Sequence, residues 1–292
     1  LWRDGSGYYH HSNNERGNAV HLVQKILGVD YKPALDYIYQ NVLGKSSYTL
    51  DYEIYKNRDD EKENKNFSLP EKTKPKRIYA YLIQKRGIDK RIISSLIKSK
   101  QIFEEKDRGN VCFVGYDKNK NPKYCAKRGT SDKQFRGETA NSNKSYGFFI
   151  EGKSDILKVF ESPIDAISHA NLAFITNGNW QKDTRLSLGG CSDKALEQHL
   201  KDYPNKYKTI WFCLDNDKAG VEAATLLANK YMNNFNVIKK TAIGKDWNED
   251  LQQIRDLENQ FNCTSLQACA YLYKQIPIPS IEHMEEELQL CE

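Results

Sequence analysis

The sequence contains 292 residues, of which 28% are charged and 39% hydrophobic, and its formal net charge is +5. This length is sufficient for two domains with buried cores, and no apolar run approaches the ~20 residues of a membrane span, so the composition predicts a soluble protein. The seven cysteines are scattered without a Cys-x-x-Cys pair, which excludes a disulfide scaffold and indicates the reducing cytoplasm.

The N-terminal residues 1–43 read as a small helical piece. The chain starts at Leu1 without an initiator methionine or a signal-peptide pattern, so we expect it to be cut from a longer protein. Residues 17–28 predict a short amphipathic helix stopped by glycine, and a second helix starts near Asp30. Residues 44–76 are rich in charged and amide side chains and predict a flexible linker.

Residues 77–150 form a basic region. From residue 72 to residue 150 there are 20 Lys/Arg and 7 Asp/Glu, a balance of +13 that leaves −8 for the rest of the chain. The pattern predicts a helix over 77–87, a second helix capped by Asp89, and a β-hairpin over 111–128. Such a region suits polyphosphate partners, although basic runs are equally often solvated surface.

Residues 151–258 contain two short apolar runs that end on carboxylates. The first ends at Glu161 and the second at Asp215 and Asp217, and each is followed by a helical pattern. Buried strands of a parallel sheet bring ligands to their carboxyl ends, so these side chains should meet there. If Asp215 and Asp217 both stay extended, they point the same way. Crowded carboxylates repel one another unless a hard cation neutralises them, which favours Mg²⁺ or Mn²⁺.

The end of the chain, residues 259–292, contains no motif that indicates catalysis or ligand binding. It predicts one helix over 265–273, a break at Pro277 and Pro279, and a short acidic terminal helix over 282–287.

The acidic constellation resembles the Toprim domain, the metal-binding module of bacterial-type primases, topoisomerases and some nucleases. The resemblance covers about 155–258 and rests on four elements in order. These are Glu161 followed by Ser-Pro-Ile-Asp-Ala-Ile, the Leu188-Gly189-Gly190 turn, Asp215-x-Asp217 followed by Lys-Ala-Gly, and the segment 244–250. It implies metal ligation by Glu161, Asp215, Asp217 and Asp246, the first three being catalytic. Asn248 occupies the place where primases often have a second Asp, with Asp250 just beyond.

The basic region is similar to the basic half of a bacterial primase core, and closer still to the uncharacterised domain that precedes Toprim in many plasmid and conjugative-element proteins. That similarity makes several side chains candidates for binding template phosphates or the incoming triphosphate. Two lysines of the Toprim-like part join them, because one starts a helix whose N-terminus favours an anion and the other precedes Asp246. The candidates are Arg108, Asn110, Lys123, Arg128, Lys144, Lys218 and Lys245.

Residues 1–43 also resemble the back half of the zinc-binding module that opens bacterial primases. No cysteine precedes Cys112, so no thiolate zinc site can be built there, and we expect no structural zinc.

Together these resemblances imply an α/β protein: a mixed α+β basic subdomain followed by a Rossmann-like parallel sheet, after a small helical piece. The implied function is a primase-like nucleotidyltransferase of a plasmid or other mobile element. It would synthesise short oligonucleotides from nucleoside triphosphates on single-stranded DNA by two-metal-type phosphoryl transfer. Helicase or relaxase partners are compatible with it, and no membrane is expected. A Toprim nuclease, or a non-catalytic nucleic-acid-binding module of a relaxase or replication complex, remains open.

Overall fold

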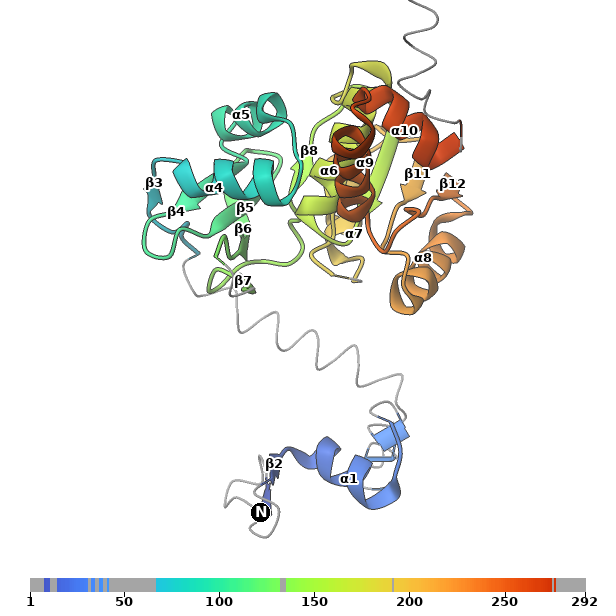
Figure 1. Ribbon diagram of the computed structural model, residues 1–292. Helices are drawn as coiled ribbons and strands as arrows, with labels where there is room; N and C mark the ends of the chain where they lie inside the picture. Colours follow the sequence, from blue (N-terminus) through green and yellow to red (C-terminus); the bar gives the residue numbers. More distant parts are fainter. Residues whose placement is uncertain are drawn as a thin grey trace, which may run out of the picture. The chain divides into compact units, whose positions relative to one another are not determined.

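The computed structural model describes residues 8–10, 15–30, 33–34, 37–38, 41, 67–131, 135–190, 192–274 and 276. The chain divides into two compact units, Leu1–Asn66 and Phe67–Glu292 (Figure 1). No helix in the described ranges has the length and apolar character needed to cross a membrane. The predicted acidic helix over 282–287 and most of the predicted linker lie outside the described residues.

Among its described residues, the first unit shows a short hairpin and the helix α1, followed by a few further helical residues. Strands β1 (Tyr8–His10) and β2 (Glu15–Gly17) pair antiparallel, and α1 spans Ala19–Leu27. Asn18 caps α1 by accepting a hydrogen bond from the His21 backbone N–H at 3.0 Å, and Gly28 ends it with φ 64°. Glycine adopts this left-handed conformation without strain, so the predicted helix stop is confirmed. Of the second predicted helix, residues 33–34, 37–38 and 41 are described and helical.

The second unit begins with an antiparallel sheet of order β3-β4-β5-β6-β7. Its strands are β3 (Lys72–Thr73), β4 (Ile102–Glu105), β5 (Val111–Tyr116), β6 (Pro122–Arg128) and β7 (Arg136–Glu138). The predicted hairpin is confirmed as β5 and β6. Its turn is fixed by Asp117, whose carboxylate accepts the backbone N–H groups of Asn119 and Asn121. Since Phe67 opens this unit and β3 pairs with β4, residues 67–76 belong to it and not to the linker.

Helices α4 (Lys76–Ala80) and α5 (Lys90–Lys98) accompany this sheet. The predicted helix over 77–87 is α4 followed directly by a π-helical turn, η1 (Tyr81–Lys85), and the chain then reverses at Gly87 with φ 68°. Asp89 caps α5 through the Arg91 backbone N–H at 2.7 Å, as the sequence indicates. π-Helical turns such as η1 are frequent at functional sites.

The second sheet has the order β12-β11-β9-β10-β8, with β8 antiparallel to β10 and the other neighbours parallel. The strands are β8 (Phe149–Ile150), β9 (Ile156–Phe160), β10 (Thr184–Ser187), β11 (Thr209–Phe212) and β12 (Asn236–Lys239). The predicted strands before Glu161 and Asp215 are therefore β9 and β11, and they are direct parallel neighbours. The α/β class expected from the sequence is confirmed.

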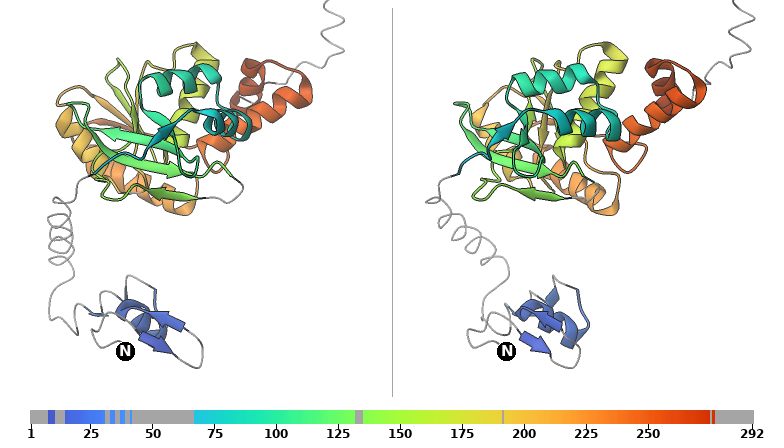
Figure 2. Two further views of the ribbon diagram at one scale, coloured as in Figure 1. Left: turned by 90° about the vertical axis from the view of Figure 1, so that its left-hand side faces the viewer. Right: turned by 60° about the vertical axis from the view of Figure 1, so that its left-hand side comes forward.

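Helices cover both faces of this sheet. On one face lie α6 (Pro163–Asn177), α9 (Trp247–Phe261) and α10 (Ser265–Lys274), with α9 and α10 packed beside α6 (Figures 1 and 2). On the other lie α7 (Lys194–Asp202) and α8 (Lys218–Tyr231). The apolar core formed by buried side chains of α6 and α9 also includes Leu82, Ile92 and Phe113 of the basic subdomain. Both halves of the second unit therefore share one core.

Candidate active site

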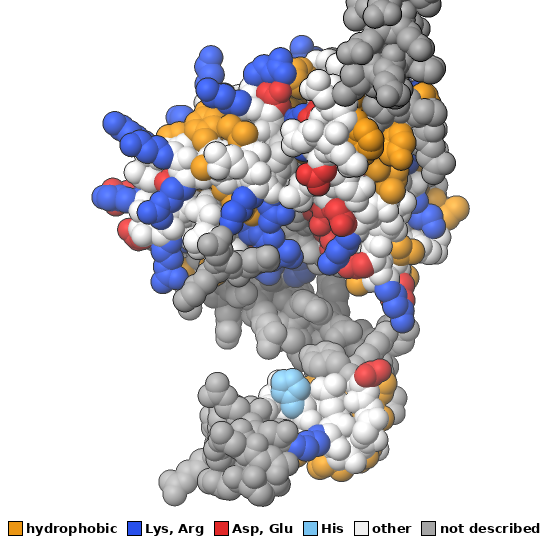
Figure 3. All heavy atoms as spheres, in the orientation of Figure 1, with side chains coloured by type: hydrophobic (Ala, Val, Ile, Leu, Met, Phe, Trp, Pro, Cys, Tyr) orange, Lys and Arg blue, Asp and Glu red, His pale blue; other side chains and the backbone are white. Residues whose placement is uncertain are grey.

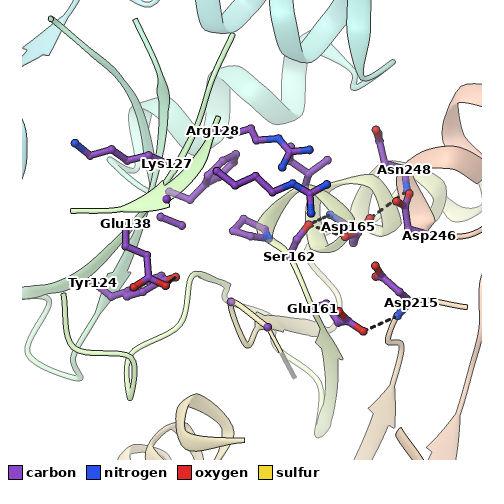
Figure 4. Close-up of a pocket in the computed structure, with 18 of the residues that line it drawn as sticks. Tyr124, Lys127, Arg128, Glu138, Glu161, Ser162, Asp165, Asp215, Asp246 and Asn248 are labelled. Atoms are coloured by element: carbon purple, nitrogen blue, oxygen red, sulfur yellow. Dashed lines mark hydrogen bonds between the residues drawn. The ribbon is translucent and has the colours of Figure 1, made fainter. Parts of the chain in front are cut away.

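A cavity of about 570 Å³ lies between the antiparallel sheet and the carboxyl ends of the parallel strands (Figure 4). One wall carries Tyr124, Ala126 and Arg128, which alternate along β6 and therefore face the same side. The opposite wall carries carboxylates that follow β9 and β11. In the space-filling view, Lys and Arg side chains spread over the basic subdomain, and a group of acidic side chains lies next to them (Figure 3).

Glu161 and Asp215 are brought together because β9 and β11 are neighbours. Each follows its strand's last residues, and Glu161 Oε1 accepts a hydrogen bond from the Asp215 backbone N–H at 3.3 Å. The turn at Gly189 and Gly190 also lines the cavity, and the Gly190 N–H donates to the Glu161 carbonyl at 3.1 Å. A Cβ at Gly189, where φ is +70°, would lie 2.7 Å from the Tyr124 hydroxyl. Glycine is therefore required for this close approach.

Asp215 is the least satisfied carboxylate of the site. Its Oδ1 is buried and has no hydrogen-bond partner. Desolvation, followed by repulsion from Asp165, Glu161, Asp246 and Asp217, raises the pKa of Asp215 to about 7. Figure 4 shows this carboxylate directed toward Asp246 and Asn248.

Asp165, on the first turn of α6, is a fourth carboxylate that the sequence reasoning did not select. Its Oδ1 accepts the Asn248 backbone N–H at 3.3 Å, and its Oδ2 lies 2.5 Å from the Ser162 hydroxyl. Burial, aided by repulsion from Asp246, raises the pKa of Asp165 to about 7. The spacing Ser162-x-x-Asp165 is a helix N-terminal capping pattern directly after Glu161, and it could have placed this carboxylate at the site.

Asp217 does not line the cavity. The chain bends after Asp215, and Asp217 becomes the N-cap of α8, with Oδ1 accepting the Gly220 N–H at 3.0 Å. Its Oδ2 is 3.8 Å from Lys245 Nζ. The prediction that Asp215 and Asp217 point the same way required both residues to stay in an extended strand, and this condition is not met because β11 ends at Phe212.

The segment from Asp246 to Asp250 ties several elements together. Asp246 lines the cavity and caps α9 through the Glu249 N–H at 2.8 Å. Trp247 donates its indole N–H to the Cys213 carbonyl at 2.9 Å, next to Asp215. Asp250 is fully buried and accepts the N–H groups of Ile243 and Gly244 at 3.0 and 2.7 Å. Asp250 therefore holds the loop that precedes Asp246 and has no access to the cavity.

The cationic wall differs from the predicted one. Among the predicted residues Arg128 lines the cavity, and it lies toward Asp165 and Asn248 (Figure 4). Lys127 also contributes to the lining, but its ammonium group points away and pairs with Glu105 at 2.5 Å. Arg86 and Arg136 also line it and were not predicted. Arg86 follows the π-helical turn, a backbone feature that composition does not reveal.

The remaining predicted cations and amide lie elsewhere on the molecule. Asn110 is buried and donates to Glu105 at 2.5 Å. Lys123 and Lys144 pair with Asp117 at 3.8 Å and Glu138 at 3.2 Å. The other three are Arg108, exposed in the turn between β4 and β5, Lys218, exposed at the start of α8, and Lys245, beside Asp217.

The donors present fit a hard divalent cation. No three His, Cys, Asp or Glu side chains within the described residues already form a closed metal cage. However, Glu161, Asp165, Asp215 and Asp246 supply only oxygen, which is the donor type of Mg²⁺ and Mn²⁺. The unpartnered Asp215 oxygen and the raised pKa of its carboxyl are what a cation would relieve.

A Rossmann-like sheet with such a cluster at its strand ends, preceded by a basic subdomain, defines a Toprim-type module. Comparison with known families agrees: residues 158–251 match the Toprim-like family, and residues 80–154 match a family described as a protein of unknown function, DUF3991. The chain carries a DUF3991 domain followed by a Toprim-like domain.

Two curated proteins are similar over most of this chain. The 65 kDa protein of Zymomonas mobilis is 28% identical over 87% of this chain and 45% of its own length. The uncharacterized protein pXO2-78 of Bacillus anthracis, a plasmid-borne homologue, is 27% identical over 75% of this chain and 64% of its own. The chain thus spans less than two thirds of either relative.

Solved primase structures are similar at low identity. The primase fragment of the bacteriophage T7 primase-helicase protein is 21% identical, covering 61% of this chain and 71% of its own, with a TM-score of 0.44. The Aquifex aeolicus primase is 15% identical, covering 88% of this chain and 73% of its own, with a TM-score of 0.40.

Proposed function

We propose that this chain is a primase-like nucleotidyltransferase that joins nucleotides on single-stranded DNA in a plasmid or other mobile element. The observation that carries the proposal is the cavity of about 570 Å³ itself, in which four carboxylates of the Toprim-like domain, one with an unpartnered buried oxygen, face a wall that carries arginines and one further carboxylate, Glu138. Phosphoryl transfer needs this pairing, with carboxylates for a cation and cations for phosphates.

Each wall has a separate task in this proposal. Asp215, Glu161 and Asp246 hold the divalent ion, and Asp165 supports them from α6. Arg128 and Arg86 bind phosphate oxygens of the template or of the incoming triphosphate. When bound, the ion would neutralise the carboxylates and stabilise the charge that develops on the leaving phosphate. The two subdomains share one hydrophobic core, so the two walls of the cavity are held in one body.

Two further facts support a polymerising enzyme of a mobile element. The basic subdomain precedes the Toprim-like domain, which is the order expected of primases, and a relative is plasmid-borne.

The test is oligonucleotide synthesis from nucleoside triphosphates on single-stranded DNA with Mg²⁺ or Mn²⁺. We expect short products from the wild type and at least a hundredfold less from Asp215→Asn. Asp256→Asn is the control, because Asp256 is exposed on α9 outside the cavity. Degradation of the template in place of synthesis would identify a nuclease, and DNA binding without either product would identify a binding module.

A further inference from the structure

Asn248, the second residue of α9, is only 2% exposed and lies at the junction of the two subdomains. It lines the cavity together with Asp165 and Arg86. A buried amide has to satisfy two donors and an acceptor, so its partners indicate what it holds.

The Asn248 side chain holds Arg86 from two sides. Arg86 Nη1 donates to Asn248 Oδ1 at 2.9 Å, and Asn248 Nδ2 donates to the Arg86 backbone carbonyl at 2.9 Å. The guanidinium is fixed further by Nε, which donates to the Tyr81 hydroxyl at 2.9 Å, and by its position over the Tyr81 ring. No Asp or Glu of the described residues forms an ion pair with Arg86, so its charge remains available to an anion in the cavity.

The same residue is anchored to the acidic side of the cavity. Asn248 Nδ2 also donates to the Ser168 hydroxyl of α6 at 2.9 Å, and its backbone N–H donates to Asp165 Oδ1 at 3.3 Å. One side chain and one amide group therefore connect the cationic wall, the carboxylate cluster and the helix that carries Asp165.

A carboxylate would not reproduce the bonds of this amide. Aspartate has no donor for the Arg86 carbonyl, and it would add a further negative charge beside Asp165 and Asp246. The structure thus explains why asparagine stands where an acidic residue was the expected alternative.

We propose that Asn248 is a positioning residue that fixes the Arg86 guanidinium at a set distance from the carboxylate cluster, so that one phosphate group can contact both walls. This inference rests on the proposed function. It assigns to Asn248 no contact with the ion or the reacting atoms.

The test is a double-mutant cycle with Asn248→Leu and Arg86→Met, read out as the affinity for a nucleoside triphosphate in the presence of Mn²⁺ by titration calorimetry. We expect each single variant to weaken binding about tenfold and the double variant to be no weaker than Arg86→Met, because Asn248 acts through Arg86. Unchanged affinity in Asn248→Leu, or losses that multiply in the double variant, would overturn the proposal.

Gln252→Met is the matched control. Gln252 also ties α9 to the same turn, through a hydrogen bond from Nε2 to the Lys85 carbonyl at 2.8 Å, but it does not line the cavity. We expect this variant to keep its affinity within about twofold. If Asn248→Leu does not fold, Ser168→Ala replaces it, since it removes one acceptor of the Asn248 amide, with an expected loss of about threefold.

A second readout separates this inference from the proposed function. Amide hydrogen exchange at Gly87 and Ile88 should accelerate in Asn248→Leu relative to Gln252→Met, whether or not a nucleotide binds. If the wild type binds no nucleotide, the proposed function fails, but hydrogen exchange still tests whether Asn248 holds Arg86 in place. Equal amide exchange rates at Gly87 and Ile88 in Asn248→Leu and wild type would overturn the positioning role of Asn248.

Discussion

Replacing Asp165 by asparagine should stabilise the protein at alkaline pH and leave its stability almost unchanged near pH 4. Asp165 is buried, and its pKa is raised from the ordinary value of 3.8 to about 7. The unfolded chain releases this proton first, so stability falls as the pH rises from about 4 to about 7 and then levels off. Asparagine keeps the shape, and its side chain can still bond Ser162 and the Asn248 N–H.

The magnitude follows from the pKa values. A rise from 3.8 to about 7 corresponds to on the order of 4 kcal/mol of unfolding free energy lost by the wild type above pH 7. Part of this is repulsion from Asp246 and Glu161, which weakens when the structure relaxes, so we expect Asp165→Asn to gain roughly 2–4 kcal/mol at about pH 8.

The assay is urea unfolding followed by circular dichroism at about pH 4 and about pH 8, with chelator and with saturating Mg²⁺. Bound Mg²⁺ stabilises the ionised carboxylates, so the advantage of Asp165→Asn at about pH 8 should shrink in its presence. Asp256→Asn, on the exposed side of α9, serves as the control. A gain of equal size at both pH values, or no gain at about pH 8, would refute the argument that Asp165 is a strained buried acid.

Three further outcomes are expected. Gly220→Ala should cost about 1–3 kcal/mol of stability and reduce activity, because a Cβ there would lie 2.1 Å from the Asp215 carbonyl oxygen and 2.8 Å from Glu161 Oε1. Thermal unfolding measures the loss of stability, and the synthesis assay measures the loss of activity. Arg128→Met should weaken single-stranded DNA binding and reduce its salt slope by about 1, whereas Lys123→Met, outside the cavity, should change affinity less than about twofold in fluorescence anisotropy. Chelation should lower the wild-type melting temperature at about pH 8 but leave Asp215→Asn nearly unaffected, and an equal drop in both would contradict metal binding at Asp215.

Hydrophobic periodicity and the residues that end helices were sufficient to predict much of the fold. The apolar runs before Glu161 and Asp215 became the neighbouring strands β9 and β11, and the hairpin over 111–128 formed as β5 and β6. These features depend on residues that are close in the sequence, so short sequence patterns are enough to predict them. The first two runs predicted that Glu161 and Asp215 meet at one edge of the parallel sheet, whereas Asp246 was expected from the resemblance to Toprim domains.

The cationic wall could not be predicted in this way. Every Lys and Arg of the basic region had similar local context, and only the pairing of β5 with β6 and the π-helical turn turned Arg128 and Arg86 toward the carboxylates. Lys123 and Lys144 instead pair with Asp117 and Glu138 of the basic subdomain.

The sequence by itself determined the strand–helix order and placed Glu161 and Asp215 at strand ends, because these features depend on neighbours within a few positions. Only the tertiary structure decided that Asp217 caps a helix, that Asp165 enters the cavity and that Asn248 joins both walls. The direction of a side chain after a strand ends depends on how the chain bends and packs, and contacts such as that between residues 86 and 248 exist only after folding.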